Sequence, residues 1–113
     1  MTTTDTLFEV LVEPNRRRIL ELLRGGQRPV SEIVAAVGLS QPAVSKHLSI
    51  LKEAGLVVVR PEAQRRLYQL RPEPLSALDA WLAPYRELWE RRLDALERHL
   101  DAMPDVPPPD AVE

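Results

Sequence analysis

Polar side chains recur along a segment near the middle of the chain whose apolar residues follow a helical spacing. Gln41 carries an amide that offers a donor and an acceptor together, the pair that the major-groove edge of adenine requires. Lys46 carries a flexible cation that suits O6 and N7 of guanine. Val44, Leu48 and Leu51 recur at i, i+4 and i+7, so they are predicted to face a core and leave the polar groups exposed. This segment therefore has the side chains needed to read base edges.

The chain lacks the residues that disulfide bonds, metal sites and common catalytic sites require. The chain has no cysteine, which excludes a disulfide framework, a thiolate metal site and a cysteine nucleophile. It shows no nucleophile–base pair, phosphate-binding glycine loop or carboxylate constellation, so we expect no enzyme activity. The two histidines are His47 and His99, and the spacing of Glu97 and His99 turns them to different sides of a helix. We therefore predict neither a metal nor another cofactor.

Charge is divided unevenly along the 113 residues, although the formal net charge is only −2. Residues 1–13 carry three acidic and no basic residues. Residues 14–71 carry eleven Lys and Arg against four Asp and Glu, a net charge of +7, and residues 72–113 have a net charge of −6. A basic middle between acidic flanks favours a nucleic-acid partner, although a solvated basic face would give the same count.

Apolar spacing, caps and helix breakers predict the order of the elements. Pro14 opens a helix where its missing N–H costs nothing, and Gly25 ends that helix. Ser31 and Ser40 are predicted N-caps. Pro84 must kink the last helix or open a second one. The expected helices cover residues 4–11, 14–24, 32–37, 41–54 and 74–102, and the expected strands cover 56–60 and 66–70, with a polar connection over 61–65.

The length predicts one domain over residues 1–103. Residues 104–113 hold four prolines and three acidic residues, which predicts a disordered tail. No apolar run approaches the ~20 residues of a membrane span. Residues 1–5 lack the regions of a signal peptide, so we expect a cytoplasmic protein that has no membrane partner.

The pattern is that of a winged helix-turn-helix. Two short capped helices are joined by Gly38 and Leu39, and a Val-rich hairpin with arginines near its tip follows them. The segment 39–57, LSQPAVSKHLSILKEAGLV, resembles the recognition region of the ArsR family of bacterial repressors, and the segment 14–23, PNRRRILELL, resembles its second helix. The resemblance covers residues 5–100. It implies a mainly α fold with a small β-hairpin, in the order α-α-α-α-β-β-α, that forms a dimer.

The resemblance also implies DNA-binding roles for particular residues. The base-reading positions fall on Gln41, Pro42, Ser45 and Lys46, the phosphate contacts fall on Ser31, Ser40 and Ser49, and the wing contacts fall on Arg65 and Arg66. Plainer roles remain open: the two serines of the predicted N-caps could be caps only, and the wing arginines could be ordinary surface charges. His47 is interpreted as structural, because it lies toward the core side of its helix.

Many relatives in this family release DNA on binding a metal. Their ligands are cysteines on the third helix, or Asp and His residues on the last helix. Here the third helix has no cysteine, Trp81 stands where a ligand His would be expected, and the partner positions are Arg92 and Ala95. The resemblance is therefore to a metal-independent branch of the family, and the sequence identifies no inducer.

The first and last helices carry more large apolar residues than one small domain needs on one face. The resemblance implies that these helices pair across a two-fold axis, and the predicted interface consists of Leu7, Phe8, Leu11, Tyr85, Trp89, Leu93, Leu96 and Leu100. Trp81 and Trp89 could instead cover the core of their own protomer, and each could have a different role.

These observations predict a homodimeric transcriptional repressor that binds a two-fold symmetric operator in double-stranded DNA. One alternative is a winged-helix module for protein–protein contact that has no specific DNA binding. Another is a DNA-binding sensor of a small apolar ligand held near the two tryptophans.

Overall fold

The computed structural model describes residues 3–104. Packing divides the chain into two compact units, of which the first ends at Trp81 and the second begins at Leu82. The predicted tail over 104–113 lies outside the described residues except for Pro104. The predicted domain boundary at residue 103 stays a prediction.

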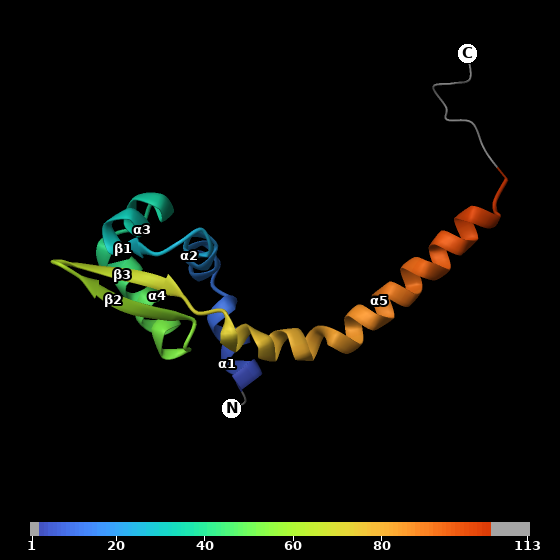
Figure 1. Ribbon diagram of the computed structural model, residues 1–113, viewed down its shortest axis with the longest axis horizontal. Coiled ribbons are helices and arrows are strands. Elements are labelled where there is room, and N and C mark those ends of the chain that lie inside the picture. Colours follow the sequence, from blue (N-terminus) through green and yellow to red (C-terminus); the bar gives the residue numbers. More distant parts are fainter. Residues whose placement is uncertain (1–2, 105–113) are drawn as a thin grey trace, which may run out of the picture. The chain divides into compact units, whose positions relative to one another are not determined.

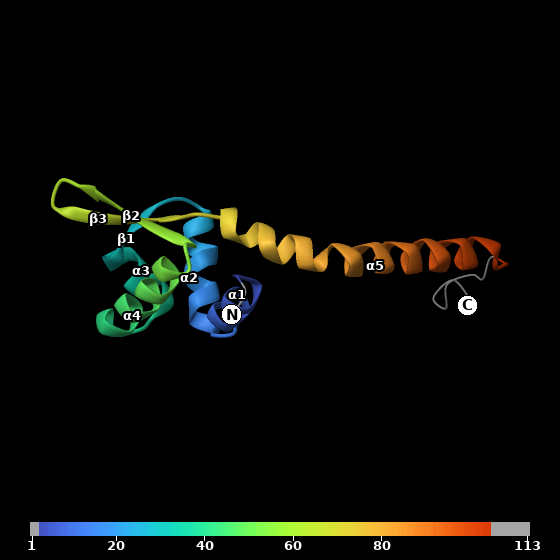
Figure 2. The same cartoon turned by 90° about the horizontal axis from the view of Figure 1, so that it is seen from below.

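Four helices of the first unit follow the sequence pattern closely. They are α1 (Thr3–Leu11), α2 (Pro14–Arg24), α3 (Val30–Val37) and α4 (Gln41–Glu53). The side chain of Glu13 accepts a hydrogen bond from the Arg16 N–H at 3.0 Å and caps α2, whose first turn contains Pro14. Both views show α3 and α4 as neighbours, the two helices of the helix-turn-helix (Figures 1 and 2).

The prediction that Ser31 is an N-cap is wrong. The helix α3 begins at Val30, and its N-cap is Pro29, whose extended backbone makes no side-chain cap hydrogen bond. Pro29 also pairs with Leu67 in the sheet, and this pairing fixes where the chain enters the helix. Gly38 ends α3 as predicted, because its φ of 71° is left-handed and its N–H donates to the Val34 carbonyl at 3.0 Å.

The sheet has three antiparallel strands in the order β1-β3-β2: β1 (Arg28–Pro29), β2 (Val57–Glu62) and β3 (Arg65–Leu70). The sequence predicted only the β2–β3 hairpin, because the two residues of β1 are too few to show a pattern. The predicted connection over 61–65 was too long. Pro61 pairs with Arg66 and Glu62 pairs with Arg65, so the turn is only Ala63 and Gln64. Pro61 is tolerated because β2 is an edge strand.

The core of the first unit confirms the predicted buried side of α4. Val44, Leu48 and Leu51 are fully buried together with Ile19, Ile33 and Leu56. Leu7 on α1 belongs to the same core, with an exposed fraction of 1%. The recognition segment is therefore anchored in a core that its own chain forms.

The last helix, α5 (Ser76–Ala102), follows a 3-10 turn, η1 (Glu73–Leu75), and contains Pro84 in its interior. Pro84 therefore does not open a second helix, although it lacks the N–H that would reach the carbonyl four residues earlier. All residues from 84 to 104 are exposed in the single chain. The second unit therefore presents a helix whose large apolar side chains are exposed in the single chain.

Candidate nucleic-acid interface

The exposed side of α4 carries every side chain that the sequence assigned to base reading. Gln41 is the first residue of the helix, and Pro42, Ser45 and Lys46 follow it on the solvent side, as does Ser49. None of these side chains is needed by the core, which takes the opposite face. A helix whose exposed face is made of short or flexible polar groups can enter a major groove about 12 Å wide.

Ser40 is a true N-cap of α4. Its hydroxyl oxygen accepts a hydrogen bond from the Ala43 N–H at 3.3 Å, and its carbonyl accepts one from the Val44 N–H at 3.0 Å. The hydroxyl of Ser40 is exposed and keeps its own proton to donate, so capping does not prevent a contact with a phosphate oxygen.

The two wing arginines have partly different neighbours. Arg65 Nη2 lies 4.0 Å from Glu62 Oε2, its cross-strand partner, and both side chains are exposed. Arg66 lines a groove with Ser45, Ser49 and other residues of α4. The turn of the hairpin projects past α3 and α4 in both views (Figures 1 and 2).

Two residues outside the predicted set line a groove beside the exposed face of α4. Lys52 lines the groove between α4 and the wing, and Tyr68 lines it from β3. Lys52 follows Ser45 and Ser49 at i+7 and i+3, so the helical spacing alone could have identified it. The position of Tyr68 depends on the register of the hairpin, and the sequence does not show this register.

A second groove, of about 380 Å³, joins the start of α3 to the wing. Ser31 lines it together with Gln64, Arg65, Arg66 and Tyr68. The structure therefore brings Ser31 close to the wing arginines, although Ser31 is not a cap. Ser31, Arg65 and Arg66 are all exposed and remain predicted backbone contacts.

The arginines at the start of α2 are engaged within the chain. Arg16 Nε donates to the Val10 carbonyl at 2.7 Å, and Arg17 Nη1 donates to the carbonyls of Leu11 and Val12. These carbonyls belong to the last turn and the end of α1, where helical donors are missing. These arginines therefore join α1 to α2.

His47 lies on the core side of α4 and faces the cap of α2. Its Nε2 lies 4.0 Å from Glu13 Oε2, and its Nδ1 is buried with no hydrogen-bond partner among residues 3–104. Burial raises the pKa of the Glu13 carboxyl. Backbone hydrogen bonds from Arg16 and Asn15 and the charges of His47 and Arg16 outweigh burial, so the pKa lies below its usual value. These contacts favour the structural interpretation of His47.

The start of α5 is joined to α1 by an aromatic contact. The ring of Trp81 packs edge-to-face on Phe8, with ring centroids 5.2 Å apart. Among residues 3–104, no three His, Asp or Glu side chains gather as a possible metal site. Within the same residues, no helix is both long and apolar enough to cross a membrane.

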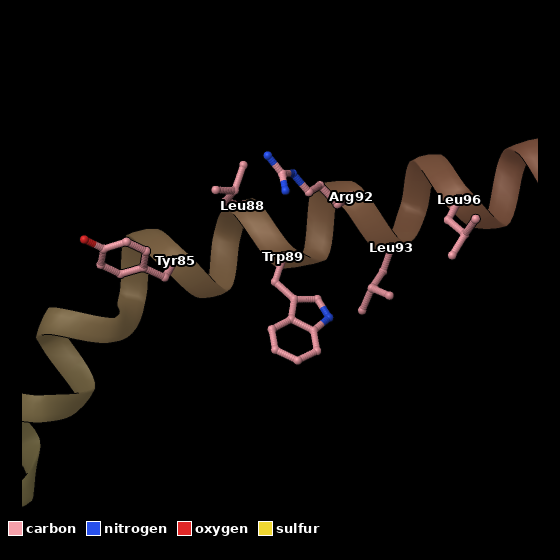
Figure 3. Close-up of a pocket in the computed structure, with 6 residues that line it drawn as sticks. All are labelled: Tyr85, Leu88, Trp89, Arg92, Leu93 and Leu96. Carbon is pink, nitrogen blue, oxygen red and sulfur yellow. The ribbon is translucent and has the colours of Figure 1, made fainter.

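The predicted dimer residues fall into two groups. Those of α5 are exposed, and an open groove of about 400 Å³ on this helix is lined by Tyr85, Leu88, Trp89, Arg92, Leu93 and Leu96. Figure 3 shows Trp89 and Leu93 on one side of the helix and Leu88 and Arg92 on the other. On α1, Phe8 is exposed, Leu11 is partly buried, and Leu7 lies in the core of the protomer. Leu7 therefore has no surface to offer a partner, which corrects the predicted set.

Comparison with known proteins agrees with this geometry. The family model described as "Bacterial regulatory protein, arsR family" matches residues 13–59. The chain is 39% identical to the HTH-type transcriptional regulator Rv2034 of Mycobacterium tuberculosis, over 89% of this chain and 92% of that protein. It is 32% identical to the transcriptional repressor SdpR of Bacillus subtilis, over 69% of this chain and 87% of that protein.

Solved structures give the same result. A crystal structure of an ArsR family transcriptional regulator, RHA00566, is 32% identical, with a TM-score of 0.68 over 78% of this chain and 91% of that one. A homodimeric winged helix-turn-helix DNA-binding domain from Mycobacterium bovis is 30% identical, with a TM-score of 0.61 over 75% of this chain and 79% of that one. The chain therefore belongs to the ArsR family of bacterial regulatory proteins, which are DNA-binding transcriptional regulators and not enzymes.

Proposed function

We propose that the chain is a homodimeric repressor that occupies a two-fold symmetric operator in the cytoplasm. In each protomer α4 enters the major groove, and Gln41, Pro42, Ser45 and Lys46 meet base edges. Ser31, Ser40, Ser49 and the wing arginines contact the backbone. Repression follows because the bound dimer occupies promoter DNA.

The observation that carries the proposal is the division of α4 into two faces. Its apolar residues are buried in the core, whereas its exposed face holds only polar side chains and Pro42. The region 14–71, which contains this face, has a net charge of +7. A protein-contact module would not need this excess of positive charge, whereas binding to phosphates does.

A homodimer is supported by the apolar face of α5. Trp89 and Leu96 have exposed fractions of 66% and 52% in the single chain, and the exposed apolar face continues to Leu100. Contiguous apolar surface of this kind marks an interaction site. A second copy supplies a matching apolar face, and the neighbour from Mycobacterium bovis is described as homodimeric.

Selection of bound sequences from random DNA duplexes, at two salt concentrations, tests the function. We expect a sequence with mirrored halves, bound less tightly at the higher salt concentration. Failure to enrich any sequence, together with weak binding that does not depend on salt, would refute the proposal and favour a protein-contact module.

A second candidate is a DNA-binding sensor of a small apolar ligand. The groove on α5 has a volume of about 400 Å³ and is lined mainly by aromatic and aliphatic side chains, which is within the size range of ligand pockets. If such a ligand binds there, it should quench Trp89 fluorescence and change operator affinity. If instead the dimer interface covers this groove, an apolar probe such as ANS should bind only to the monomer, and this result would argue against the ligand sensor.

A further inference from the structure

A small groove separates the exposed side of α4 from the wing. Its volume is about 140 Å³, and its lining consists of Ser45, Leu48, Ser49, Lys52, Val59, Arg66 and Tyr68. The hydroxyl groups and the two cations are its polar part. It is the place where the described residues bring a cation of the recognition helix together with a cation of the wing.

The spacing of these residues on α4 and β3 explains why they line the same groove. Ser45, Ser49 and Lys52 follow one another at i, i+4 and i+7, so they lie along one side of α4. Arg66 and Tyr68 are two residues apart on β3 and therefore point to the same face of the sheet. The side chain of Tyr68 packs partly against the core that holds α4, so this face of the sheet is the one that meets α4.

The charges in the groove are unbalanced. Within residues 3–104, neither Lys52 nor Arg66 forms an ion pair with a carboxylate, whereas Arg65 lies beside Glu62. Two cations with the hydroxyl groups of Ser49 and Tyr68 around a small volume are groups that bind a phosphate. We propose that Lys52 and Arg66 together hold one phosphate of the DNA backbone in this groove. The inference rests on the proposed function, because it concerns the same DNA interface.

The position of Lys52 favours a phosphate over a base. Lys52 lies in the last turn of α4, one residue before the helix ends at Glu53. In recognition helices the N-terminal residues contact base edges, so a cation at the other end is placed for the backbone. The two cations then act as a unit, because both are directed at the same phosphate.

The salt dependence of operator affinity tests this pair in the full-length protein. We expect Lys52→Gln with Arg66→Gln to lower the slope of log affinity against log salt by about 0.9 per half-site, or roughly 1.8 per dimer. Between 50 and 200 mM salt the double variant should therefore lose about twelvefold less affinity than the wild type. The matched control is Arg24→Gln, which removes an exposed cation that does not line the groove.

A neutral methylphosphonate linkage, moved one position at a time through the operator, locates the phosphate. One position per half-site should weaken the wild type and leave the affinity of the double variant unchanged. Circular dichroism and melting temperature show whether the variants are folded. If the wild type binds the operator but the folded double variant keeps its slope, the inference is wrong and the proposed function stands. A changed base preference in the double variant would also overturn the inference. Absence of operator binding by the wild type would refute the proposed function itself.

Discussion

Helices α4 and α5 are both amphipathic, but their apolar faces have different partners. The apolar face of α4 is buried by its own chain, and Leu48 has an exposed fraction of 1%. The apolar face of α5 is open, and Leu96 has an exposed fraction of 52%. Helix α4 therefore buries its apolar residues within one protomer, whereas we propose that α5 buries its own against a second copy. The difference separates the part of the molecule that reads DNA from the part that we propose assembles it.

The largest expected effect is that of Leu96→Asp. A charge placed in a dry interface costs several kcal/mol, so sedimentation should show a monomer and tight operator binding should be lost. The control is Arg98→Ala, which changes a residue of the polar side of α5. A Leu96→Asp variant that remains dimeric and binds normally would place the interface elsewhere.

Leu48→Ala tests the other half of the comparison. Removing this buried side chain leaves a cavity, so the free energy of unfolding should fall by about 2–5 kcal/mol in urea or thermal unfolding. The neighbouring Ser49→Ala should change stability by less than about 0.5 kcal/mol, because Ser49 is exposed. Equal effects of the two variants would contradict the division of α4 into two faces.

Gln41→Ala tests base reading at the start of α4. We expect a loss of about 1–3 kcal/mol of binding free energy per half-site and a relaxed preference at one position, repeated in the mirrored half. The salt slope should stay unchanged, since no phosphate contact is lost. Sequence selection with the variant decides the matter, and an unchanged operator motif would remove Gln41 from the base-reading set.

The smallest expected effect concerns Glu13, whose pKa is lowered in the folded protein. A carboxyl with a lowered folded pKa stabilises the fold above its unfolded value of 4.5, and this contribution disappears as pH falls through the folded value. The melting temperature of the wild type should therefore fall in acid more steeply than that of Glu13→Gln. If the melting temperatures of the two proteins fall equally with pH below pH 5, Glu13 makes no such contribution.

The sequence predicted those features that depend on residues close together in the chain, such as helix caps and helix breakers. Pro14, Gly38 and Ser40 act within one turn of their own position, and helix boundaries near them were predicted within one or two residues. The strand β1, the burial of Leu7 and the groove contacts of Tyr68 depend on residues far along the chain. Periodicity carries no information about such contacts, so these features required the structure.

The DNA-binding and dimer roles of individual residues stay predictions. Helical spacing placed the polar face of α4 correctly, because burial of Val44 and Leu48 fixes the rotation of the helix. The inclusion of Leu7 in the interface was wrong, since an apolar residue on a surface helix can serve either its own core or a partner. Spacing alone does not distinguish these two uses.

The junction between α1 and α2 has a consequence for the spacing of the operator. Arg16 and Arg17 join α2 to the end of α1, and Glu13 lies beside His47 of α4. Helices α1 and α4 also share one core, so we expect the recognition helix to keep its orientation relative to α1. If α1 contributes Phe8 to the dimer, the two recognition helices are held at a fixed separation and rotation. Inserting one base pair between half-sites adds about 3.4 Å and roughly a tenth of a turn. The dimer should then bind only operators with one separation between half-sites. In a series of operators with different spacers, affinity should therefore show a single sharp optimum.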